Sequence, residues 1–177
     1  PVRTRYEALD MVIDAAETLG YPRNHDYNGA SQDGFGYYQV TQKNGLRFSA
    51  KKAYLQPARK RPNLRIITHA HVTKISLAGK RADGVHYNQH GKSHHIKAGR
   101  EVILSAGAIQ SPQILELSGI GAPDHLRRHA IEVRHELSGV GSHLTDHYIS
   151  RLSWRLRRNI SLNNRAHGIG LAAEILR

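Results

Sequence analysis

The sequence contains no cysteine among its 177 residues. A chain without cysteine can form neither a disulfide nor a thiolate metal site, and it suits a reducing compartment. It also lacks any run near the roughly 18 consecutive apolar residues that a membrane span requires, and it has no charged and apolar leader. We therefore expect neither a membrane span nor a signal peptide. Apolar residues recur instead in short periodic blocks, which indicates a folded domain of about ordinary size.

Acidic residues are scarce beside basic ones. The chain carries 26 Lys and Arg against 14 Asp and Glu, a formal net charge of +12. Such an excess favours contact with phosphates or anionic lipid surfaces. The basic residues are scattered without interleaved aromatics on a recognisable nucleic-acid module, so no nucleic-acid partner is expected.

The N-terminal third predicts helices separated by turns. Apolar spacing indicates an amphipathic helix from Tyr6 to Leu19, with Thr4 as its cap and Gly20 as its stop. Residues 21–48 are rich in Gly, Asn, Asp and Pro and predict turns and irregular segments. A second helix is expected after Ser49, running toward Pro57.

The middle of the chain changes to strand patterns. Turn residues at Gly79 and Gly91 separate short alternating runs, which predicts an antiparallel meander. The expected strands are Leu64–Ile67, Val72–Leu77, Gly84–Tyr87 and His94–Lys97.

A compact apolar strand at Arg100–Leu104 then leads through a small-residue turn into a helix at 109–117. This strand, turn and helix sequence is typical of an α/β domain. A shorter helix at 123–129, a strand at 131–134 and a glycine-rich loop at 139–147 are expected to follow.

One segment carries a specific signature. Residues 107–121 read GAIQSPQILELSGIG and match, at every constrained position, the second signature of the glucose-methanol-choline oxidoreductases. Its three required glycines alone would coincide by chance about once in a few thousand windows. The chain resembles this family throughout, most closely its bacterial choline-dehydrogenase-like branch, and the other matching blocks are 27–29, 34–39, 45–49, 53–55, 61–64, 84–85, 100–103 and 139–147.

The resemblance implies an α/β fold, namely a fragment of an FAD/NAD(P)-binding, Rossmann-like domain with an inserted antiparallel β-meander and part of a substrate domain. Residues 1–60 are expected to form a helical and turn-rich segment adjoining the substrate domain. Residues 61–150 are expected to form the flavin-domain portion, and 151–177 the start of the substrate domain.

The implied cofactor is FAD. A dinucleotide needs closely approaching backbone donors, so small residues should lie where the strand at 100–104 ends. Ser105, Ala106 and Gly107 are therefore the candidate cofactor contacts, and the resemblance places this turn against the ADP half of FAD. It also implies that Val72 touches the adenine region through its backbone. The alternative is that Ala106 and Gly107 only permit tight packing of strand on helix.

The implied reaction is oxidation of a primary alcohol, a small-molecule substrate, with hydride passing to FAD. The family's dinucleotide fingerprint and active-site histidine map before and after this region, so no catalytic residue is named. We expect an incomplete piece that is inactive alone and binds FAD weakly or not at all. The electron acceptor stays open between oxygen and another carrier, and a non-redox lyase on the same scaffold is a further alternative within the resemblance. The expected location is the cytoplasm, with peripheral contact to the bacterial inner membrane through the positive charge. The alternative function is a non-enzymatic, basic module that binds nucleic acid or anions.

Several other features have a structural interpretation. Ser111-Pro112 is typical of a helix start, with serine as the cap and proline first in the helix. Residues 118–121 predict a helix stop and a bend with positive φ. Asp146 and His147 are expected to make structural hydrogen bonds.

No metal site is expected. The pairs His69 and His71, and His125 and His129, lack a third ligand at a suitable spacing. The G-x-G-x-x-A pattern at 168–173 follows no predicted strand, and the Asn159 glycosylation triplet is a single copy, so both are interpreted as coincidence.

Overall fold

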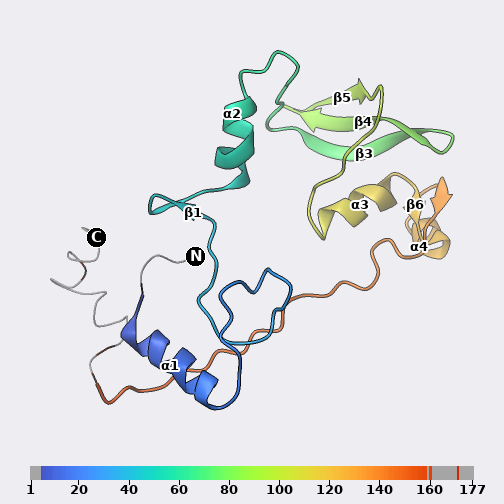
Figure 1. The fold of residues 1–177 in the computed structure, drawn as a ribbon. Helices are drawn as coiled ribbons and strands as arrows, with labels where there is room; N and C mark the ends of the chain where they lie inside the picture. The colour runs from blue at the N-terminus through green and yellow to red at the C-terminus, as the bar shows by residue number, and fades with distance from the viewer. Residues whose placement is uncertain (1–4, 159, 161–170, 172–177) are drawn as a thin grey trace. The chain divides into compact units, whose positions relative to one another are not determined.

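The computed structural model describes residues 5–158, 160 and 171 (Figure 1). Contacts divide the chain into two compact units. One comprises Arg65–Ile149, and the other comprises the described residues before and after it. The assignment of residues 1–60, 61–150 and 151–177 to substrate and flavin domains stays a prediction. Within the described part of the chain, no helix is both long and apolar enough to cross a bilayer.

The first unit contains the predicted N-terminal helix. Helix α1 spans Glu7–Thr18, and Ile13 and Ala16 are its buried residues. Gly20 follows with φ +88°, the left-handed conformation that ends helices and favours glycine. Tyr6 occupies the N-cap position without a side-chain cap, and the predicted cap, Thr4, lies outside the described residues.

A small hairpin and a short helical segment complete this unit. Strands β1 (Gln42–Lys43) and β2 (Leu46–Arg47) pair antiparallel around Asn44 and Gly45. Both turn residues have positive φ, as a two-residue hairpin loop demands. The π-helical turn η1 (Lys51–Leu55) then continues into α2 (Gln56–Ala58). The predicted helix thus exists but runs past Pro57, which is one of the first residues of α2.

The second unit contains the predicted meander. Strands β3 (His71–Ala78), β4 (Arg81–Gln89) and β5 (Lys92–Lys97) form one antiparallel sheet in the order β3-β4-β5. Gly79 and Gly91 have positive φ in the two connecting turns. The meander prediction is confirmed because alternating side chains and glycine turns are both local signals.

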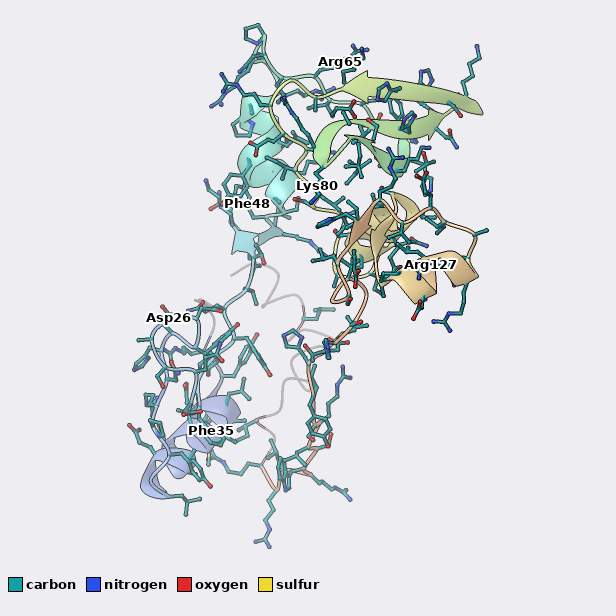
Figure 2. The ribbon with its side chains drawn as sticks, turned by 90° about the vertical axis from the view of Figure 1, so that its right-hand side faces the viewer. Asp26, Phe35, Phe48, Arg65, Lys80 and Arg127 are labelled. Carbon is teal, nitrogen blue, oxygen red and sulfur yellow. The ribbon has the colours of Figure 1, made fainter. Side chains whose placement is uncertain are left out.

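One face of the meander packs against the signature helix. Helix α3 spans Gln110–Leu117 and contacts β3, below the sheet in Figure 1. Ile75 of β3 and Ile114 of α3 are both buried. Helix α4 (Pro123–Arg128) follows and buries Leu126 completely; Figure 2 draws the side chains of this unit, with Arg127 labelled on α4.

Three strand predictions are wrong. Residues 64–67 and 100–104 form no strand, because no segment among the described residues pairs with them. The exposure of successive residues still alternates along 101–106, as it does in a strand, but no neighbouring strand among the described residues is hydrogen-bonded to this segment. The strand expected at 131–134 lies instead at β7 (His135–Glu136), which pairs parallel with β6 (Ile120–Gly121). This pairing begins there because the Gly119 carbonyl accepts the N–H groups of Arg134 and His135.

Candidate functional site

Three of the four predicted cofactor contacts line one cavity. Val72 reaches it from β3, and Ser105 and Ala106 reach it from the turn before α3. The cavity has a volume of about 510 Å³, within the size range of small-molecule sites. Its other lining residues come from β3, β4, the segment before the turn and α3: Ala70, His71, Ile75, Val85, Val102, Ile103, Leu104, Gln110, Gln113, Ile114 and Leu117.

The chemistry of this lining suits a ligand with a flat apolar part. Aliphatic side chains make most of the wall, and a few polar side chains, among them His71, Gln110 and Gln113, interrupt it. Sites for small molecules and cofactors combine a mostly apolar surface with few polar groups in the same way. Sequence analysis missed the two glutamines, which lie one helical turn apart on α3 and carry no signal that separates them from surface residues.

Gly107 is needed for its backbone conformation. Its φ is +95°, a region that side chains with a Cβ rarely adopt. A Cβ placed on it would meet no atom of the described residues within 4 Å. Tight packing of strand on helix therefore does not explain this glycine, and the turn presents an open face at the predicted contact.

The hydroxyl of Ser111 closes the same turn. The backbone N–H of Ala106 donates to Ser111 Oγ over 3.0 Å, and the N–H of Ser111 donates to the Gly107 carbonyl over 3.0 Å. The predicted role of Ser111 as a helix cap is wrong. Ile109 occupies the N-cap position and Ser111 lies inside the first turn of α3, so its hydroxyl fastens the preceding loop instead.

Several backbone donors of the turn stay available, among them those of Gly107 and Ala108. The N–H groups of Gly107 and Ala108 have no acceptor among the described residues. Backbone donors of this kind, next to glycine, are what a nucleotide cofactor approaches.

Ser118 fastens the other end of α3. The buried N–H of Ile75 donates to Ser118 Oγ over 2.8 Å, and the hydroxyl donates to the Ile114 carbonyl over 2.5 Å. The helix stop was predicted correctly, since Gly119 follows with φ +81°. The bond to β3 was missed, because only the fold brings Ile75 beside a serine far along the chain.

The remaining candidate residues do not join this site. Asp146 and His147 are 95% and 92% exposed, and the N–H of His147 donates to Asp146 Oδ1 over 2.7 Å. A wider hydrogen-bonding role for them stays a prediction. No group of three His, Asp or Glu suited to a metal ion occurs in the described part of the chain. Asn159 and all but one of residues 168–173 lie outside the described residues.

Comparisons with known proteins agree on one family. The GMC oxidoreductase family model matches residues 2–149. The oxygen-dependent choline dehydrogenase 1 of Chromohalobacter salexigens is 45% identical over 163 residues, which cover 92% of this chain and 29% of that protein. The chain thus spans under a third of the length of this curated relative.

Solved structures share the fold. An FAD-dependent oxidoreductase from Chaetomium thermophilum matches with a TM-score of 0.69 and 28% identity, over 77% of this chain and 24% of that one. Pyridoxine 4-oxidase from Mesorbium loti matches with a TM-score of 0.65 and 27% identity, over 77% of this chain and 27% of that one. The predicted fold class, an α/β piece of a flavoprotein with an antiparallel meander, is confirmed.

Proposed function

This chain belongs to the GMC oxidoreductase family, and we propose that it forms part of the FAD-binding wall of an enzyme that oxidises a primary alcohol. Choline is the alcohol we favour, because choline dehydrogenases are the relatives with 43–48% identity. The observation that carries the proposal is the cavity in which Val72 meets Ser105 and Ala106.

The residues of the cavity fit the adenosine end of FAD. The aliphatic walls from β3, β4 and residues 102–104 offer a surface for a flat base. The N–H groups of Gly107 and Ala108, which have no acceptor in the described part of the chain, offer donors to a sugar or phosphate oxygen beside it. When bound, the flavin supplies the hydride acceptor for the alcohol. This chain's share of the work is to bind and orient the cofactor, and the open turn at Gly107 lets its backbone approach.

The proposal also names an electron acceptor and a cellular location for the protein. Oxygen is the acceptor we favour, because two of the most similar relatives are named oxygen-dependent choline dehydrogenases. Oxygen consumption measured against reduction of an artificial dye separates oxygen from another carrier. We place the protein in the cytoplasm, with peripheral contact to an anionic membrane through its net charge of +12.

Nucleotide binding to the chain itself tests the proposal. We expect millimolar ADP to shift the amide NMR signals of Val72, Ser105 and Ala106 in the isotopically labelled chain, with weak affinity. Gly107→Ala should weaken this binding roughly tenfold, because a Cβ at φ +95° strains the turn by about 1–2 kcal/mol. Gly99→Ala is the matched control, since Gly99 has open space around it and no positive φ.

Two results would contradict the proposal. One is the absence of ADP-induced shifts at the cavity while other parts of the chain respond. The other is equal affinity in the Gly107→Ala and Gly99→Ala variants. Turnover of choline by the chain alone, with stoichiometric flavin, would contradict the separate statement that it holds only part of the machinery.

A further inference from the structure

The turn that holds Ser105, Ala106 and Gly107 receives little support from packing. The segment leading into it pairs with no strand among the described residues, and Ile103 is 79% exposed. Gly107 has no atom within 4 Å of its Cβ position. Because few packed side chains surround this turn, its conformation has to be fixed by hydrogen bonds.

Ser111 supplies those bonds from both its side chain and its backbone. Its Oγ accepts the Ala106 N–H and its own N–H donates to the Gly107 carbonyl, each over 3.0 Å. Together these two bonds close a ring over residues 106–111. A rotation of the Ala106 peptide would break the first bond, and a rotation of the Gly107 peptide would break the second.

The same helix connects this ring to the sheet. Ile114 is buried against β3, and Ser118 accepts the Ile75 N–H at the far end of α3. Val72 lies on β3, so the helix joins the strand that carries one predicted contact to the turn that carries the others. The two serines of one helix thereby link β3, which carries Val72, to the turn, which carries Ala106.

We propose that Ser111 is a positioning residue for the cofactor, one that fixes the Ala106 peptide so that the Gly107 and Ala108 donors stay presented to the ligand. The inference rests on the proposed function. Ser111 does not touch the ligand in this proposal, because it is not among the residues that line the cavity and its Oγ accepts the Ala106 N–H. Its effect on affinity comes from preorganisation, since a fixed turn has less conformational freedom to lose on binding.

A different role for the bond between Ser111 and Ala106 would change the affinity for the ligand in the opposite direction. If the bond to Ser111 merely kept a donor away from the ligand, its removal would free the Ala106 N–H as a third donor and tighten binding. Preorganisation predicts weaker binding instead. The direction of the change in affinity therefore decides between the two.

Ser111→Ala and Ser111→Thr, each compared with Ser93→Ala, test the proposal in the full 177-residue chain. The hydroxyl of Ser93 donates to Asn88 Oδ1 at an exposed end of the meander and makes a control for the loss of a hydroxyl. ADP affinity and the hydrogen exchange rate of the Ala106 amide are measured by NMR. We expect Ser111→Ala to raise the exchange rate of Ala106 and to weaken ADP binding roughly 2- to 10-fold, the range of one net hydrogen bond.

Rescue separates positioning from general destabilisation. Ser111→Thr keeps the hydroxyl and should restore both exchange and affinity, while Ile75 and Ile114 signals stay unchanged in all variants. Unchanged or tighter ADP binding in Ser111→Ala, with Ala106 exchange accelerated, would overturn the positioning role and leave the proposed function intact. Absence of ADP binding in the unmodified chain would overturn the proposed function, and the positioning role with it.

Discussion

Replacing Ser118 with alanine should destabilise the second unit more than any other single hydroxyl removal in the meander and signature helix. Ser118 is 7% exposed, and its Oγ accepts the N–H of Ile75, which is itself 7% exposed. Alanine leaves that buried donor without a partner, which costs about 1–3 kcal/mol. The lost bond to Ile114 adds little, because the Ile114 carbonyl still accepts the Ser118 N–H over 3.1 Å.

Urea unfolding followed through amide signals of Arg65–Ile149 measures this cost. A loss of about 1–3 kcal/mol corresponds to roughly 2–12 °C in melting temperature for a chain of this size. The Ile75 amide should also exchange faster than its neighbours in β3. Ser93→Ala, which removes an exposed hydroxyl, should change stability by less than about 0.5 kcal/mol. Equal stability of the two variants would refute the reasoning, because it would mean that the bond from Ile75 contributes nothing net.

Two further predictions concern the same unit. Gly119→Ala should destabilise this unit by more than about 2 kcal/mol, because φ is +81° and a Cβ would clash with the Glu132 carbonyl oxygen. Gly99→Ala is the control. Similar urea midpoints in the two variants would count against the prediction. Acid should also destabilise the unit through His86, whose pKa is lowered by burial and by the nearby charges of His95 and Lys74, against the opposing effect of Asp83. In acid, the unfolded state therefore binds more protons at His86 than the folded state does. The free energy of unfolding is highest above the unfolded pKa of about 6.5, and it falls as the pH drops from there through the lower folded pKa. Urea titrations from pH 8 to pH 5 should show that the stability of His86→Gln falls less steeply with pH than that of the unmodified chain. An identical slope in the two proteins would contradict the role of His86.

Sequence reasoning succeeded where the signals were local. Alternating side chains with Gly79 and Gly91 between them specify the meander, and both glycines adopt the positive φ that such turns require. Apolar spacing and Gly20 specify α1 in the same way. These elements depend on residues a few positions apart, so the chain alone predicts them.

The failures arise where the fold, and not the local pattern, decides which partner a residue has. Residues 100–104 have the composition of a strand, but a strand requires a neighbour, and none of the described segments pairs with them. Ser111 precedes a proline as helix caps do, yet its partner is Ala106, which only the turn at Gly107 brings within reach. Val72 had no local signal at all, and only the family resemblance indicated it as a contact of the adenine region; the structure places it in the same cavity lining as Ala106.

The spacing of the two serines explains how one short signature can shape the proposed cofactor site. Ser111, Ile114 and Ser118 occupy positions i, i+3 and i+7, which share one side of a helix and span about 10 Å. Ile114 contributes apolar burial in the middle, and a hydroxyl at each end accepts a backbone N–H from another segment. Rotation of the helix about its axis would break its contacts with β3 at Ile114 and Ser118, and the bond between Ser111 and Ala106 makes the preceding turn move with the helix. The turn on one end is therefore linked through the helix to β3 on the other, even though the flanking segment at 101–104 has no strand partner in the described part of the chain.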